Sequence, residues 1–123
     1  MNTVKDTIAY AEEHNLHILI DWDIDINAYT GIIFYYAEWA PSILNLRVLF
    51  EEILKTPTVK ICILDIDFME RYQYIFEQPG MKPNGWGEIY WMRNGKLLHS
   101  IKHVMRPNEY KNIEIWNKEL LEE

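Results

Sequence analysis

A chain of 123 residues with 49% hydrophobic and 25% charged side chains predicts one globular domain, over residues 1–123, and argues against a disordered chain. The net charge of −7 argues against nucleic acid as the main ligand, because phosphate binding needs a basic patch. The same charge is compatible with a basic protein partner, or with solubility alone.

The N-terminal residues show no charged segment followed by a long apolar run, so no signal peptide is predicted. The apolar runs are all far shorter than the roughly 18 residues that a membrane span requires. We therefore expect a soluble, cytoplasmic protein that does not bind membranes.

The first half of the chain alternates helical and strand patterns. Val4, Ile8 and Ala11 have helical spacing, and Pro41 suits the first turn of a helix. The predicted elements are a helix over 3–15, a strand over 16–22, a turn-like segment over 23–30, a strand over 31–37, a helix over 41–55 and a strand over 59–65.

The second half contains a predicted hairpin between two helices. Asn94-Gly95 is typical of a tight turn between strands, and Asn108 is a predicted cap for the last helix. The predicted elements are a helix over 69–76, a loop over 78–85, strands over 86–92 and 97–104, and a helix after Pro107.

Crossover connections together with one antiparallel hairpin predict a mixed sheet with helices on both faces. The link from residue 22 to residue 31 is short for a parallel crossover, which usually takes a dozen residues or more. The sequence therefore leaves the topology of the N-terminal third open.

The segment Ala37-Glu38-Trp39-Ala40-Pro41-Ser42-Ile43 lies between an apolar run and a predicted helix, and it resembles the A-E-W-C-G-P-C active site of thioredoxins. The segments 59–67 and 85–95 are similar to two further thioredoxin phrases, in the right order. The resemblance implies an α/β protein with a thioredoxin-like three-layer α/β/α sandwich and a mixed central sheet.

The resemblance also implies that the chemistry of the family is missing. Ala40 stands at the position of the nucleophilic cysteine and Ile43 at that of the resolving cysteine. Phe34 matches the buried aspartate, Ile63 its lysine neighbour, and Gly87 the proline that the family holds in the cis form. Thiol exchange needs a thiolate, a resolving thiol and a base, so we expect a degenerate member without oxidoreductase activity, cofactor or metal.

Other candidate groups favour ordinary structural roles. Cys62 lies within an apolar strand pattern, where burial raises the pKa of a thiol and makes it inert. Ser42 has no nucleophile elbow around it and suits helix capping. His99 and His103 are four apart on a predicted strand and share one side, but no further metal-ligand spacing accompanies them.

The segment from Asp21 to Asp25 is similar to the D-x-D-x-D opening of a calcium loop. That loop needs Gly at its sixth position and Glu at its twelfth, where this chain has Ile26 and Ile32. An EF-hand is therefore excluded.

Acidic residues follow three of the predicted strands. Asp23 and Asp25 follow one, Asp67 a second and Glu38 a third, so parallel strands would bring all four to the same carboxyl edge. Three interpretations stay open: aspartates that cap helices and end strands, a surface for a basic protein, and a site for a divalent cation.

Trp39 and Trp86 are expected to flank the former active-site groove, where aromatic side chains ringed by charge resemble a binding hot spot. The proposed partner-binding residues are Trp39, Ala40, Pro41, Ile43, Trp86, Gly87, Glu38, Asp23, Asp25 and Asp67. We predict a redox-inactive protein-binding module with a chaperone-like or scaffold role; the alternatives are an acidic immunity or inhibitor protein and an enzyme of another kind. A homodimer is compatible with the 5 Trp and 8 Tyr residues.

Overall fold

The computed structural model describes residues 4–21, 23–37 and 40–122. In chain order its elements are α1 (Val4–Glu13), β1 (Ile18–Ile20), β2 (Gly31–Tyr36), α2 (Ala40–Ile53), β3 (Ile61–Asp65), α3 (Met69–Phe76), β4 (Ile89–Arg93), β5 (Lys96–Ile101), the 3-10 turn η1 (Pro107–Glu109) and α4 (Tyr110–Leu121). Among the helices of these residues, none has the length and apolar character that crossing a bilayer requires.

The five strands form one mixed sheet in the order β1-β3-β2-β4-β5. β3 pairs in parallel with both β1 and β2, with Cys62 opposite Leu19 and Ile33. β4 runs antiparallel to β2, with Ile89 opposite Phe34, and β5 runs antiparallel to β4. The predicted mixed sheet is confirmed.

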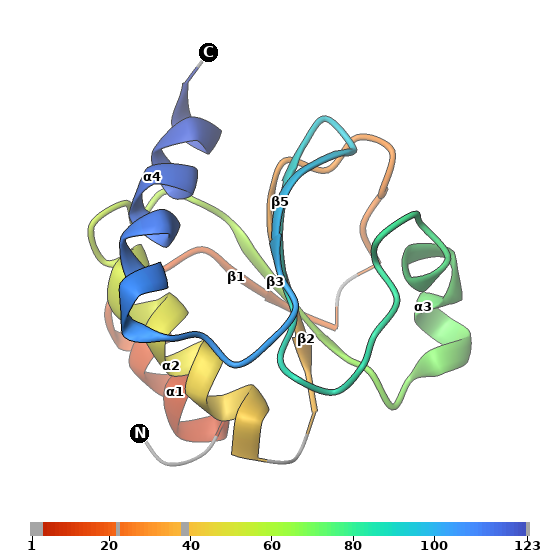
Figure 1. The fold of residues 1–123 in the computed structure, drawn as a ribbon, viewed down its shortest axis with the longest axis horizontal. Helices are drawn as coiled ribbons and strands as arrows, with labels where there is room; N and C mark the ends of the chain where they lie inside the picture. Colours follow the sequence, from red (N-terminus) through yellow and green to blue (C-terminus); the bar gives the residue numbers. More distant parts are fainter. Residues whose placement is uncertain (1–3, 22, 38–39, 123) are drawn as a thin grey trace.

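Helices cover both faces of the sheet (Figure 1). α1, α2 and α4 lie on one face, and α3 lies on the other. The central strand β2 contributes side chains to the hydrophobic clusters on both faces of the sheet, because successive side chains of a strand point to opposite faces. Ile32 and Phe34 belong to the cluster under α2, whereas Ile33 and Tyr35 belong to the cluster under α3. The three-layer α/β/α sandwich is therefore present as predicted.

The link between β1 and β2 crosses β3 without a helix. β1 and β2 are not neighbours, because β3 pairs with each of them. The link contributes three buried side chains, Ile24, Ile26 and Tyr29, to the cluster that α3 covers. These apolar residues cover the sheet where a crossover helix would otherwise lie, which explains how so short a connection suffices.

Two predicted boundaries were wrong. The strand predicted from Trp86 begins only at Ile89, because Gly85 and Gly87 have φ values of +84° and +78°, which no strand tolerates. Asn108 does not cap the last helix: it lies inside η1, and the residue before α4 is Glu109.

The predicted hairpin turn at Asn94–Gly95 is present and is fastened to the β1–β2 link. Both residues have positive φ, at +48° and +77°. The Gly95 N–H donates to the Tyr29 carbonyl at 3.0 Å, and the Asn94 N–H donates to the Thr30 hydroxyl at 2.9 Å. The turn therefore holds two distant parts of the chain together.

Candidate functional site

The candidate site lies at the edge of the sheet where β2 and β3 end and β4 begins. β2 ends at Tyr36, β3 ends at Asp65, and antiparallel β4 starts at Ile89. Neighbouring strands are about 4.8 Å apart, so the segments after β3 and before β4 are roughly 10 Å apart across β2. α2 starts at this edge, as the sequence predicts for Ala40 and Pro41.

Gly87 packs against the first turn of α2. A Cβ atom on Gly87 would lie 2.8 Å from the Ser42 Cα and 3.4 Å from the Phe34 ring, so the close approach requires glycine. Phe34 and Ile63 are buried and opposite each other in β2 and β3. Where the resemblance implies an aspartate, a lysine and a proline, the structure has two apolar side chains and a glycine with a φ that proline cannot adopt.

The motif residues Ser42 and Ile43 lie at the start of α2, where the structure describes their side chains. Ile43 is half-buried and packs against the core cluster under α2. Glu38 and Trp39 lie outside the described residues, as do the side chains of Ala40 and Pro41. Ser42 has the predicted structural role: its buried hydroxyl accepts a hydrogen bond from the Ala37 N–H at 3.1 Å.

Trp86 lies on a loop that a buried carboxylate holds in place. Glu88 is fully buried, and its two oxygens accept hydrogen bonds from the Trp86 N–H at 2.7 Å and the Asn84 N–H at 3.1 Å. The Trp86 residue itself is 49% exposed. The loop therefore presents a large aromatic side chain to solvent from a fixed backbone.

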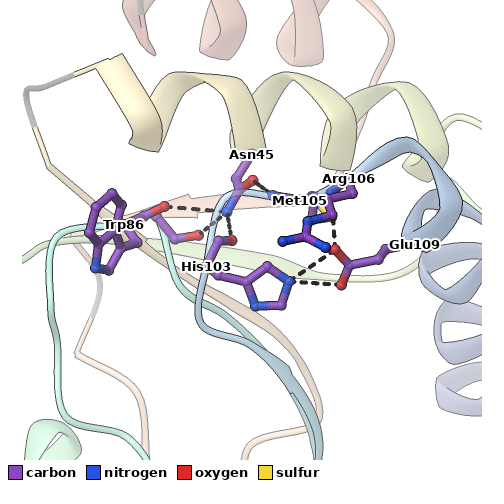
Figure 2. Close-up of polar contacts among 7 residues, drawn as sticks. Asn45, Trp86, His103, Met105, Arg106 and Glu109 are labelled. Carbon is purple, nitrogen blue, oxygen red and sulfur yellow. Dashed lines mark hydrogen bonds and ion pairs between the residues drawn. The ribbon is translucent and has the colours of Figure 1, made fainter.

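Asn45 ties three segments of the chain together (Figure 2). Its amide nitrogen donates to the carbonyls of Trp86 at 3.3 Å, Gly87 at 3.1 Å and His103 at 2.8 Å. Its oxygen accepts a hydrogen bond from the Met105 N–H at 2.9 Å. Asn45 is buried on α2, so a helix, the loop before β4 and the segment after β5 converge on one side chain.

The acidic residues predicted at this edge have different roles in the structure. Asp23 forms an ion pair with Arg71 on α3, with Nε and Oδ1 3.0 Å apart. Asp25 accepts a hydrogen bond from the Asn27 N–H at 3.0 Å, which is the local capping role that the sequence left open. At Asp67 the backbone N–H donates to the Asp65 carboxylate at 2.9 Å, so the capping side chain there is that of Asp65.

The edge nevertheless keeps its negative charge. Asp67 and Glu70 are exposed there, and within the described ranges neither has an ion-pair partner. The prediction that Asp25 lies at this edge was wrong: Asp25 is exposed beside Lys60 and Tyr29, where β3 and β2 begin, because the β1–β2 link runs back across the sheet. In the same part of the chain, no three His, Cys, Asp or Glu side chains converge as metal ligands. The described carboxylates thus form an acidic rim but no cation site.

The two histidines singled out in the sequence do not share a site. His99 on β5 contacts Glu119 at 2.7 Å and stacks on Trp116, with ring centroids 4.5 Å apart. His103 lies beyond the end of β5 and contacts Glu109 at 2.8 Å. The prediction that they face the same side of one strand was wrong, because the strand ends at Ile101.

Glu109 gives the fold a dependence on acid pH. The Arg106 N–H donates to its carboxylate at 3.0 Å and lowers the pKa of Glu109 below 4.5; the contact with His103 lowers it further. A depressed folded-state pKa means that the stabilisation is complete above the unfolded-state pKa and is lost as the pH falls through the folded-state pKa. We expect Glu109→Gln to flatten the decline in unfolding free energy below about pH 4.5. Urea unfolding from pH 3 to pH 6 measures this, and an unchanged slope would contradict it.

Sequence reasoning missed four residues at this edge. Phe68 and Met69, directly after Asp67, are each 47% exposed, although large apolar residues usually avoid solvent. Asn45 and Glu88 are buried polar groups that shape the loop around Trp86. The sequence could have pointed to Asn45, because it lies on the buried side of α2, one turn after Ser42.

The fold and the position of this edge define a protein with the thioredoxin fold. Among solved structures, the chain is similar to reduced desulfothioredoxin from Desulfovibrio vulgaris Hildenborough, with a TM-score of 0.56 and 18% identity over 79% of this chain and 95% of that one. It is also similar to a mutant thioredoxin from Halobacterium salinarum NRC-1, with a TM-score of 0.55 and 14% identity over 82% of this chain and 91% of that one. No protein-family model matches the chain, and no curated protein sequence does.

Proposed function

We propose that this chain is a redox-inactive, thioredoxin-like protein-binding module that works from the former active-site edge, in a chaperone-like or scaffold role. The observation that carries the proposal is the half-exposed Trp86 on a loop packed, through Gly87, against the start of α2. The resemblance of residues 37–43 to the thioredoxin motif assigns Ala40 and Ile43 to the positions of the two reactive cysteines.

The thiol content supports redox inactivity. Cys62 is fully buried in the layer under α3, where it cannot reach a substrate disulfide. A thiol–disulfide exchange cycle needs an accessible thiolate, so we expect no turnover in an insulin-reduction assay. Measurable turnover by the purified chain would overturn this part of the proposal.

The exposed apolar side chains at the edge support binding. We call them the Trp86 edge, and they are Leu44, Phe68, Met69 and Trp86. Asp67 and Glu70, two acidic residues that flank Phe68 and Met69, are exposed. Apolar anchors supply affinity when they are desolvated, whereas a charged rim sets the association rate and the preference for an oppositely charged partner.

We expect Trp86→Ala to weaken partner binding by about 2 kcal/mol, or roughly 30-fold in Kd, and to leave the fold intact. The half-exposed Trp86 contributes contact area to a partner but little to the core. A pull-down from native lysate followed by titration of the captured protein measures the change. Ile115→Ala is the matched control, because Ile115 is 53% exposed on α4, outside the edge. Equal binding by Trp86→Ala and the parent chain would refute the site.

The sequence argues for the same loss with Trp39→Ala, by roughly 2 kcal/mol. Trp39 lies outside the described residues, so this expectation rests on the resemblance of the motif alone. The two tryptophan variants therefore test the edge independently.

A second candidate is an acidic immunity or inhibitor protein that blocks a basic toxin or enzyme. The exposed carboxylates of Asp23, Asp25, Asp67 and Glu70, with Arg71 the nearby cation paired to Asp23, favour it. Inhibition of a basic enzyme by the purified chain, weakened at high salt, would distinguish this role from a scaffold.

A further inference from the structure

Four backbone groups of the loop that carries Trp86 are already engaged within the molecule. The Trp86 N–H donates to the Glu88 carboxylate at 2.7 Å, and the Trp86 carbonyl accepts from Asn45 at 3.3 Å. The Asn84 N–H and the Gly87 carbonyl are held by the same two side chains. We call residues 84–87 the lip; these four donors and acceptors of the lip are used by Glu88 and Asn45.

Opening this lip for another chain would be costly. Glu88 and Asn45 are both buried, so releasing the backbone would leave a buried carboxylate and a buried amide without their partners. Hydrogen bonds to an ionised carboxylate are also stronger than those between neutral groups. The next strand offers no alternative, since β4 is paired with β2 on one side and with β5 on the other.

An extended segment that binds along a sheet takes its affinity from main-chain hydrogen bonds, and side-chain pockets add only its specificity. At this lip the main-chain donor and acceptor of Trp86 are both used, and its side chain is exposed. What remains at the edge is exposed apolar area, on Trp86 before β4 and on Phe68 and Met69 after β3, where Asp67 and Glu70 are also exposed. That combination suits the apolar centre and charged rim of an interface between two folded proteins.

Resting on the proposed function, we propose that the partner of the Trp86 edge is a folded protein with a basic surface, bound through side chains, and not an extended or unfolded segment. The charge complementarity comes from Asp67 and Glu70, which flank Phe68 and Met69. The exclusion of extended segments comes from the hydrogen bonds of Glu88 and Asn45 to the backbone of the lip. A chaperone-like role is thereby disfavoured relative to a scaffold or inhibitor.

The test compares one partner in its native and extended forms. The protein captured in a Trp86-dependent manner is titrated folded, and then as overlapping 15-residue peptides that cover its sequence. Reduced, carboxamidomethylated lysozyme serves as a defined unfolded basic chain. We expect the native partner to bind at least 100-fold more tightly than any peptide, and the lysozyme chain to cause no saturable shift of the Trp86 amide in NMR spectra.

The outcomes separate the inference from the function that it rests on. Trp86-dependent binding of a peptide, or of the unfolded lysozyme chain, would overturn the inference and leave the binding module in place. If neither native nor unfolded protein binds in a Trp86-dependent manner, the proposed function fails and the inference fails with it.

The hydrogen bond from the Trp86 N–H to Glu88 can be tested without a partner protein. We expect the Trp86 amide to exchange with solvent at least 10-fold faster in Glu88→Gln than in the parent chain, because the amide would lose a charged acceptor. The amide of Ile33 in the sheet reports any global loss of stability. An unchanged rate at Trp86 would contradict the engagement on which the inference depends.

Discussion

Gly95→Ala is expected to lower the free energy of unfolding by roughly 3 kcal/mol, one of the two largest losses that we predict for a single substitution. Gly95 has a φ of +77°, which an alanine adopts only with strain. Its added Cβ would also lie 2.8 Å from the Asn27 Cα, and closer still to the Asn27 carbonyl. Urea unfolding at neutral pH measures the loss.

Gly80→Ala is the matched control for this substitution. Gly80 has nearly the same φ, +79°, but its Cβ would meet only the ends of two flexible side chains, Leu97 at 3.5 Å and Lys102 at 3.6 Å. It should therefore cost about 1 kcal/mol, the conformational part alone. Equal losses at Gly80 and Gly95 would show that the contact with the Asn27 backbone has no energetic weight.

The fold was largely predictable because its signals are local and strong. The apolar runs that became β2 and β3, and the stripe that became α2, were readable from periodicity. The start of β4 was not, because nothing local tells whether Gly85 and Gly87 interrupt a strand or precede it. Their backbone conformation depends on the approach of Gly87 to Ser42, which is a tertiary contact.

The sequence suggested where to look for the proposed site but not how that part of the structure is built. The resemblance around residues 37–43 located the edge, and Gly87 lies there as expected. The shape of the edge depends on Asn45 and Glu88. The partners of Asn45 in the loop are 41 and 42 residues away in the sequence, whereas those of Glu88 are two and four residues away. A polar residue in an apolar stripe signals that such a partner exists, but sequence periodicity does not say which one.

Acidic residues that look alike in the sequence have different roles in the structure. Both carboxylate oxygens of Asp23 accept hydrogen bonds from Arg71, 48 residues away, which offsets its charge. Asp25 accepts one hydrogen bond, from the Asn27 N–H. Capping and partner recognition are compatible at a carboxylate such as Asp25, because the turn uses one oxygen and leaves the charge exposed. The sequence presented capping and partner recognition as alternatives, but one carboxylate can serve both.

Asn45→Asp is expected to lower the free energy of unfolding by about 3 kcal/mol at pH 7. The substitution keeps the shape of the side chain and the bond from the Met105 N–H. It removes the donor to the carbonyls of Trp86, Gly87 and His103 and places a buried negative charge against them.

The loss should be smaller at pH 4 than at pH 7, because a protonated carboxyl group donates one hydrogen bond to these carbonyls and carries no charge. Urea unfolding at both pH values measures the difference. Asn84→Asp is the matched control: its exposed side-chain amide makes one bond, to the Lys82 carbonyl at 3.3 Å, and should change stability by less than about 0.5 kcal/mol. A loss at Asn45 no larger than that at Asn84 would mean that the loop before β4 is held at the helix by packing alone, and the rigid presentation of Trp86 would lose its physical basis.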